Sequence, residues 1–327
     1  MGNNEYLFVG DPHAQPNNLP DLVALGKYII TVAQETKATV VISGDLYHFH
    51  GVIHAEVQYF WWAFFETMKK LGIRFIVLKG NHDAPGTEGS LATSLIAHVS
   101  QGTMVLHQPH VENNILFCPY TSGEQLVKWA TQHPKCGTLF CHQTFDGSTY
   151  ENGFYAGDGV DPAAIPQNMV ISGHIHAPQE FAKILYPGSP RWQTLSDANT
   201  ERAIWLFEFD GRGLLQKKTP YDTGKICKRI FHFVDSPEQP LNLVPEANTE
   251  YRVDIKGPES WIRERLPLFD GIARTRRICT DTRAVAVVKE SDGVSVAFDK
   301  WVDAFQPKNN TDKTTLRKMI GERLNGF

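Results

Sequence analysis

The chain has 327 residues, 42% of them apolar, which suits a soluble protein with one large domain or two. Its five cysteines form no C-x-x-C pair, which argues against a disulfide framework or a cysteine zinc site and predicts reduced thiols in a cytoplasm-like compartment. The sequence shows neither a signal-peptide pattern nor a run of about 18 apolar residues, so we expect no membrane span.

Charge is unevenly distributed along the chain. Residues 1–211 carry 11 Lys and Arg against 20 Asp and Glu, residues 212–290 carry 15 against 11, and residues 291–327 carry 6 against 5. A basic segment suits a polyanionic partner, and part of the acidity of the first segment could be held against metal ions. Two solvated surfaces of different composition are the alternative.

Short apolar runs typical of buried strands recur through the first half of the chain. They occupy residues 6–10, 38–44, 73–80, 114–119, 137–142 and 168–174. Residues 19–34 and 54–71, between the first three runs, place apolar residues at helical spacing. This order predicts a βαβαβ unit with parallel strands, in which ligands bind beyond the carboxyl ends of the strands.

After about residue 210 the pattern changes to that of a smaller α+β segment. Its predicted elements are a turn at 209–213, strands at 225–234 and 250–257, and a helix at 259–269. Residues 295–305 and 311–324, separated by a break with Pro and Asn, predict a helical hairpin at the C-terminus.

Polar side chains follow five of the predicted strands directly. In chain order they are Asp11, His13, Asp45, His48, Asn81, His82, Asp83, His142, His174 and His176. Because parallel strands end at one edge of a sheet, we expect these side chains to converge. A single histidine after a strand is usually a hydrogen-bonded loop residue, but five clusters together favour a common site.

Asp, Asn and His without Cys suit Mn²⁺, Fe²⁺ or Zn²⁺ better than a structural zinc site. In an extended backbone, His174 and His176 point to the same side and could serve adjacent ions. With this many ligands and one carboxylate able to bridge, two ions about 3.5–4 Å apart are expected, a spacing that suits phosphorus chemistry.

The ordered motifs G-D-x-H, G-D, G-N-H-D, H and G-H-x-H, spread over residues 6–190, resemble the calcineurin-like metallophosphoesterase superfamily. The resemblance implies an α/β fold in which a two-sheet sandwich is flanked by helices. It also implies that a hydroxide between two ions attacks phosphorus in line. The implied ligands are Asp11, His13, Asp45 and His176 for one ion, and Asp45, Asn81, His142 and His174 for the other. His82 is then a general acid or phosphate contact, and the adjacent Asp83 is a further catalytic candidate.

His48 divides the subfamilies. Protein phosphatases of the superfamily have an Asp three residues beyond the bridging Asp, the position of His48 here. The motifs "GDLYH" and "GNHD", with "YPGSP" at 186–190, resemble SbcD-type nucleases of double-strand break repair, in which a second histidine helps to position the DNA phosphate. A surface histidine is the alternative.

The SbcD-type resemblance implies three segments. Residues 1–214 would form the nuclease domain, residues 215–292 a DNA-capping domain, and residues 293–327 helices that dock on an SMC-like ATPase of the SbcC type. The densest basic cluster of the capping segment is "RTRR" at 274–277, for which an ordinary solvated face is the alternative. The chain has no G-x-x-x-x-G-K-[ST] motif, so the ATPase would be a separate partner.

The short chain resembles the compact bacteriophage-encoded versions of this family. We therefore expect a cytoplasmic protein, in a bacterium or in the host cell of a phage. The stretch "YFWWAFF" at 59–65 places aromatic residues all around a predicted helix. Helices of this region pair across a twofold axis in the family, which predicts a homodimer through Phe60, Trp61, Trp62 and Phe64. A wholly internal helix is the alternative.

The sequence is compatible with three functions. The first is a nuclease with two Mn²⁺ ions, for which Mg²⁺, Fe²⁺ and Zn²⁺ are alternatives. It would have double-strand exonuclease and single-strand endonuclease activity at double-stranded DNA ends, in repair and recombination. The second is a small-molecule or nucleotide phosphodiesterase or phosphatase with the same centre. The third is a non-enzymatic scaffold, which a missing ligand would indicate; no ligand is missing.

Overall fold

The computed structural model describes residues 4–86 and 91–281, which fall into two compact units. The first unit is Met1–Phe233 with Leu243–Arg252, and the second is Val234–Asn242 with Val253–Phe327. The sequence placed a boundary after residue 214. In the structure, β12 (Leu215–Asp222) pairs with β11 (Ala203–Phe209) in a sheet of the first unit, so this unit extends beyond that boundary.

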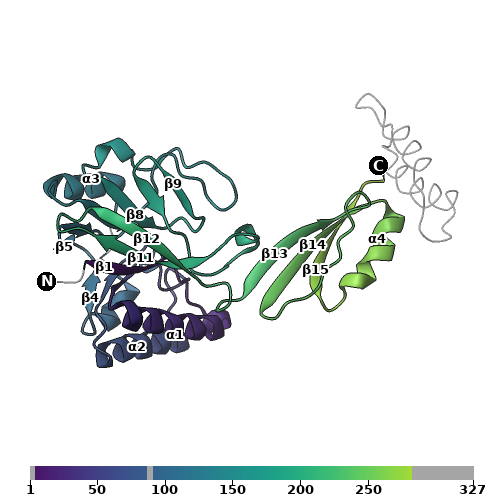
Figure 1. Cartoon of the computed structure of the whole chain (residues 1–327), viewed down its shortest axis with the longest axis horizontal. Coiled ribbons are helices and arrows are strands. Elements are labelled where there is room, and N and C mark those ends of the chain that lie inside the picture. Colours follow the sequence, from purple (N-terminus) through teal and green to yellow (C-terminus); the bar gives the residue numbers. More distant parts are fainter. Residues whose placement is uncertain (1–3, 87–90, 282–327) are drawn as a thin grey trace, which may run out of the picture. The chain divides into compact units, whose positions relative to one another are not determined.

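The first unit contains two six-stranded sheets that pack face to face (Figure 1). One has the order β12-β11-β1-β2-β3-β4 and the other β5-β6-β7-β8-β10-β9. The remaining strands are β1 (Glu5–Val9), β2 (Thr39–Ile42), β3 (Phe75–Leu78), β4 (Thr103–Val105), β5 (His110–Glu112), β6 (Ile115–Phe117), β7 (Thr138–His142), β8 (Met169–Gly173), β9 (Gln179–Phe181) and β10 (Ile184–Tyr186). Strands β1 to β4 are mutually parallel, as are β6, β7, β8 and β10, and antiparallel strands lie outside them.

Central strands are buried on both faces, which explains their continuous apolar sequences. Tyr6 and Phe8 of β1 point into an aromatic layer between the sheets. In that layer the rings of Phe117 and Phe140 stack with their centroids 5.2 Å apart. The alternate side chains of β1 point the other way, into the core beneath the helices. The predicted two-sheet sandwich flanked by helices is confirmed.

Three helices cover the sandwich, α1 (Leu19–Thr36) and α2 (Ala55–Lys70) on one sheet and α3 (Gly123–Gln132) on the other (Figure 1). Short 3₁₀ turns are η1 (Pro16–Asn18), η2 (Ser94–His98), η3 (Pro162–Ala164) and η4 (Leu195–Asp197). No helix among the described residues is long and apolar enough to cross a membrane.

The aromatic helix α2 divides its side chains between the core and the surface. Trp61 and Phe64 are buried in the chain's own core, and Trp61 Nε1 donates to the Leu46 carbonyl 3.2 Å away. Their predicted place in a subunit contact is therefore corrected. Tyr59 and Trp62 are 67% and 47% exposed and stack on each other. The homodimer stays a prediction. Among the aromatic residues of α2, Trp62 and Tyr59 are exposed and could form its contact surface.

The second unit has its own apolar centre, formed by Val253, Ile255, Ile262 and Phe269. Strands β13 (Arg229–Asp235) and β14 (Thr249–Gly257) run into it from the first unit and form a sheet with β15 (Ala273–Cys279), in which β14 is central. Its helices are α4 (Glu259–Arg265) and the 3₁₀ turn η5 (Leu266–Phe269). The predicted helices at 295–305 and 311–324 lie outside the described residues.

Candidate metal centre

The polar residues singled out in the sequence follow β1, β2, β3, β7 and β8, at the carboxyl ends of the parallel strands. Three contacts join these strand ends, and two of them, His13 with His176 and Asp45 with His142, link the two sheets. Nε2 of His13 lies 3.0 Å from Nε2 of His176 and 3.4 Å from Oδ2 of Asp45. The same Asp45 oxygen lies 3.3 Å from Nε2 of His142.

Asn81 joins a second group of contacts. Its side-chain oxygen lies 2.9 Å from Nε2 of His142 and 2.8 Å from Nδ1 of His174. Oδ1 of Asp11 lies 3.3 Å from Nδ1 of His142 and accepts the backbone N–H of His174. The structure therefore brings all seven predicted metal ligands into one cluster.

Asp45 stands at the centre of this cluster. The potential ligand atoms of His13, Asp45 and His82 lie within 4.8 Å of one another, as do those of Asp45, His142 and His174. Asp45 is common to both groups, as a bridging carboxylate would be. The first group contains His82, which was predicted from the sequence as a general acid or phosphate contact and not as a metal ligand. Asp11 and His176 belong to neither compact group and reach the cluster through His142 and His13.

The chemistry of these groups fits divalent cations. Ligands held about 2.0–2.2 Å from one ion lie roughly 3–3.5 Å from each other, close to the 2.8–3.4 Å that separates the side-chain atoms here. Oδ2 of Asp11 is buried without a hydrogen-bond partner among the described residues. Crowded acceptor atoms without matching donors are costly unless a proton or cation lies between them.

Backbone carbonyls orient two of the imidazole rings. Nδ1 of His142 lies 2.8 Å from the Ser43 carbonyl and Nδ1 of His82 lies 2.6 Å from the His48 carbonyl. Because a carbonyl only accepts, Nδ1 of each ring carries the hydrogen. Nε2 of His142 is then left as a ligand atom, as in many metal sites.

The loops that carry the cluster have unusual backbone conformations. His13, Asp45 and His174 have φ angles of 47°, 52° and 83°, in the left-handed region that costs free energy for residues other than Gly. Gly80 permits a close approach to the cluster, since a Cβ there would lie 2.2 Å from Oδ1 of Asp45. Such conformations persist only where the surrounding structure enforces them, which is common at functional sites.

Burial and neighbouring charges shift the pKa values of Asp45 and His142 in opposite directions. Burial would raise the pKa of Asp45, but the imidazoles of His142 and His13 outweigh it and hold that pKa well below its usual range. Burial would likewise lower the pKa of His142, but Asp45 and Asp11 raise it to about 9. Burial, aided by His142, lowers the pKa of His174 to about 3. These opposed shifts mark a functional site.

Asp83 does not face this cluster as a catalytic carboxylate would. It is fully buried, and its two oxygens accept the backbone N–H groups of Tyr47 at 3.2 Å and Gly80 at 2.9 Å. Burial raises its pKa to about 7. Asp83 thus positions the loops that carry Asp45 and Asn81, which corrects its predicted catalytic role.

His48 and His82 lie beside the His13 side of the cluster. The ring centroid of His82 is 4.6 Å from that of His13 and 6.1 Å from that of His48. The backbone N–H of His82 donates to Oδ1 of Asp45 over 2.8 Å. Both histidines are partly exposed, so both can reach a bound substrate.

Three residues that support the site were not identified from the sequence. Buried Arg191 donates to the carbonyls of Pro12 and His13, and so fixes the loop after β1. Glu151 accepts the backbone N–H of His176. Gln193 donates to the carbonyl of Asp11 over 2.8 Å. Each acts on a backbone group distant in sequence, so no local spacing could have revealed it.

The two-sheet sandwich and this cluster of Asp, Asn and His residues define a metallophosphoesterase. A family model described as Calcineurin-like phosphoesterase matches residues 5–178, and the chain belongs to this family. The chain is also similar to a protein of Invertebrate iridescent virus 6 named "Putative phosphoesterase 244L". The two are 25% identical over 280 residues, which cover 79% of this chain and 95% of the viral protein.

Family membership makes the chain a phosphoesterase. The family uses a dinuclear metal centre, and the two groups that share Asp45 could hold such ions here. Divalent ions bound at such a centre lower the pKa of water toward neutrality and stabilise charge on phosphoryl oxygens.

Proposed function

We propose that this chain is a Mn²⁺-dependent DNA nuclease. It would hydrolyse phosphodiester bonds at double-stranded DNA ends, together with an SMC-like ATPase, in DNA repair and recombination. The observation that carries the proposal is the place of His48. The family's protein phosphatases have a carboxylate at this position, whereas here an imidazole stands beside the metal cluster.

The surroundings of His48 suit a phosphate contact. Its ring centroid lies 5.5 Å from that of His13, and the residue is partly exposed, so its ring can reach a phosphate bound at the cluster. A neutral or protonated imidazole can donate a hydrogen bond to a phosphodiester oxygen, whereas a carboxylate would repel it. His48 would thus orient a diester, which carries one negative charge.

His82 is the residue best placed to move a proton. Its Nδ1–H is held by the His48 carbonyl, so Nε2 is the atom free to exchange a proton with a departing alkoxide. In this assignment His82 protonates the leaving oxygen, while His48 helps to hold the phosphate in place. Asp83 and Arg191 act only by fixing the loops.

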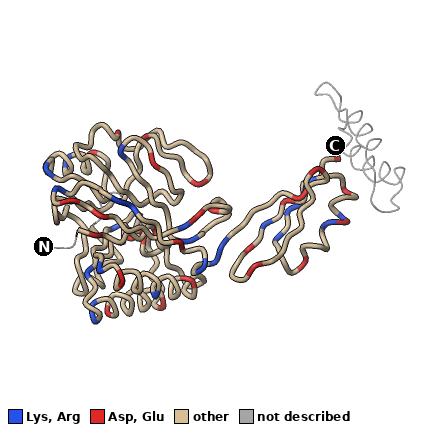
Figure 2. The backbone as a smooth tube through the Cα atoms, viewed as in Figure 1, with Lys and Arg blue, Asp and Glu red and all other residues tan. Residues whose placement is uncertain are grey.

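The second unit suits a DNA-contacting cap in part. The side chains of Arg274, Arg276 and Arg277 on β15 are exposed, although Arg276 pairs with Asp254. Lys and Arg alternate with Asp and Glu along the tubes of both units (Figure 2). Support for DNA binding therefore comes from the exposed arginines of β-strand β15 and not from a uniformly basic surface.

The substrate class is tested by the ratio of two activities. With Mn²⁺, we expect faster hydrolysis of bis(p-nitrophenyl) phosphate, a diester, than of p-nitrophenyl phosphate, a monoester. His48→Ala should lower diester turnover, and His48→Asp should lower it further. A monoester preference that these variants leave unchanged would favour a small-molecule phosphatase and refute the role of His48.

The ATPase partner is tested by truncation. A chain that lacks residues 293–327 should keep its diester activity but no longer co-purify with the SMC-like ATPase. Retained co-purification would refute the assignment of this segment.

A further inference from the structure

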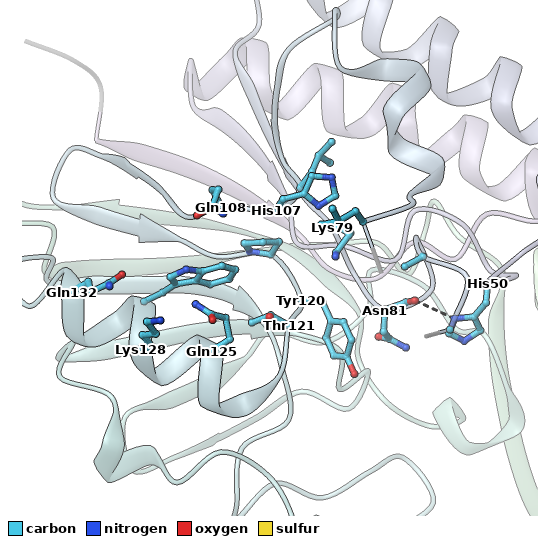
Figure 3. Close-up of a pocket in the computed structure, with 16 residues that line it drawn as sticks. His50, Lys79, Asn81, His107, Gln108, Tyr120, Thr121, Gln125, Lys128 and Gln132 are labelled. Atoms are coloured by element: carbon cyan, nitrogen blue, oxygen red, sulfur yellow. Dashed lines mark hydrogen bonds between the residues drawn. The ribbon is translucent and has the colours of Figure 1, made fainter. Parts of the chain in front are cut away.

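A groove of about 790 Å³ leads away from the metal ligand Asn81. Figure 3 shows its labelled residues running from Gln132 and Lys128 at one end, past Tyr120, to Asn81 and His50 at the other. Its volume is typical of ligand sites, which span about 300–1,000 Å³. The groove belongs entirely to the first unit.

The charge of this groove is opposite to that of its surroundings. Lys79, Lys128 and His107 line it, and its lining residues among those described include no Asp or Glu. A second groove shares Tyr120 and Thr121 with the first, but it is lined by Glu124, Asp158 and Asp161 and, within residues 4–86 and 91–281, by no Lys or Arg. The basic groove is therefore an exception within a segment, residues 1–211, in which acidic residues outnumber basic ones by 20 to 11.

Lys79 is an unusual residue in this groove. It follows β3 directly and its side chain is mostly buried; the Asp83 carboxylate favours its charged form, but no hydrogen bond or ion pair of its ammonium group is found within the part of the chain that the structure describes. Buried lysines normally have a partner, because an unpaired buried charge is costly. An anionic group of a ligand in the groove would supply one.

Tyr120 stands where the groove meets the metal cluster. Its backbone N–H donates to the Lys79 carbonyl over 2.7 Å, and its ring lies 6.0 Å from that of His174 at an angle of 27°. The side chain is partly exposed and lines both grooves. A partly exposed aromatic ring beside lysines is typical of sites for single-stranded nucleic acid, where bases stack and phosphates meet cations.

We propose that this groove binds the single strand of nucleic acid adjoining the scissile bond. Lys79 and Lys128 would contact successive phosphates, and Tyr120 would stack on a base. The acidic groove beyond Tyr120 repels the strand, so the strand leaves the metal centre on one side only. This inference rests on the proposed nuclease function, since it assigns the substrate of the same centre.

The test measures binding separately from cleavage. The probe is a short fluorescent phosphorothioate oligothymidylate, which resists hydrolysis, and its affinity for the full-length protein with Mn²⁺ is followed by anisotropy over a range of salt. Lys128→Gln should weaken binding severalfold and reduce the slope of log K against log salt by about 0.7, the value for one phosphate contact on a single strand. Gln132 is exposed at the same end of the groove, so Gln132→Glu, which adds a negative charge there, should also weaken binding.

Lys135→Gln is the matched control, because Lys135 is exposed just beyond α3 and does not line the groove. This control should leave both the affinity and the salt dependence unchanged. Equal behaviour of Lys128→Gln and Lys135→Gln would overturn the groove assignment, whether or not the protein cleaves DNA. Lys128-dependent binding without cleavage of ordinary DNA would support the groove and refute the nuclease.

Discussion

Nε2 of His13 and Nε2 of His176 lie 3.0 Å apart, although they reach the site from opposite sheets of the sandwich. Two neutral imidazoles can share one hydrogen at this distance, but the same Nε2 of His13 also faces Oδ2 of Asp45 at 3.4 Å. A divalent cation satisfies all these atoms together. We infer that the fold of this site is completed by metal.

Metal should therefore stabilise the protein. We expect the metal-stripped chain to unfold at a lower temperature than the chain with Mn²⁺, with a gain of about 2.7 kcal/mol at a concentration one hundred times the dissociation constant. His176→Ala should lose much of this gain. The exposed variant Asp270→Ala is the control and should keep it, and equal gains in both variants would speak against His176 as a ligand.

Gly80 is expected to tolerate no side chain. In Gly80→Ala the new Cβ would meet Oδ1 of Asp45 at 2.2 Å, so the bridging carboxylate must move. We expect a loss of bound metal and of about 1–3 kcal/mol of stability. Gly211→Ala is the matched control, because a Cβ at that position meets nothing within 4 Å. Elemental analysis measures the metal content, and urea unfolding measures the stability. Two ions retained by Gly80→Ala would contradict the role given to Asp45.

Asp83→Asn should destabilise the loops without removing a ligand. The amide keeps one acceptor oxygen, but its NH₂ group faces the N–H of Tyr47 or Gly80, which leaves a buried donor unpaired. A cost of about 1–3 kcal/mol follows from this lost hydrogen bond. Urea unfolding of the metal-free protein isolates the effect. Wild-type stability in this variant would show that the carboxylate does not hold the two loops.

A buried histidine away from the metal cluster should make stability depend on pH. His98 contacts the hydroxyl of Tyr47 and the side chain of Gln101, and burial lowers its pKa below the ordinary value. The folded state therefore favours neutral His98, and its contribution to stability is lost as pH falls below the unfolded value of about 6.5.

The variant His98→Gln has no such titration. Between pH 7 and pH 5 its unfolding free energy should fall less steeply than that of the wild type, by up to about 1.4 kcal/mol per pH unit. Denaturant unfolding at a series of pH values measures the difference. Parallel pH profiles would mean that His98 is protonated equally in the folded and unfolded chains.

The sequence predicted the elements that carry the site, because buried parallel strands are continuous apolar runs. Val40, Val41 and Ile42 of β2 are an example, and polar Asp45 follows at the strand end. The flanking elements were harder to predict. β11 and β12 were not identified beyond the turn between them, and β4 and β5 have only three residues each. Helix α3, which has only ten residues, was also missed.

Asp83 shows the limit of sequence reasoning within the site. It is adjacent to His82 in the chain, which suggested a shared role. The turn at this point sends the backbone N–H of His82 toward Asp45 and buries the Asp83 carboxylate against Tyr47 and Gly80. Such a division depends on backbone geometry, which the motif alone does not contain.

The nuclease activity can be measured as nucleotide release from linear duplex DNA. The metal-stripped protein is assayed with and without Mn²⁺, beside the variant Asn81→Ala and a phosphomonoester substrate. A nuclease of the kind proposed degrades DNA only with Mn²⁺ and only when Asn81 is present, with little turnover of the monoester. Rapid monoester turnover with intact DNA would contradict this proposal and would identify a small-molecule phosphatase.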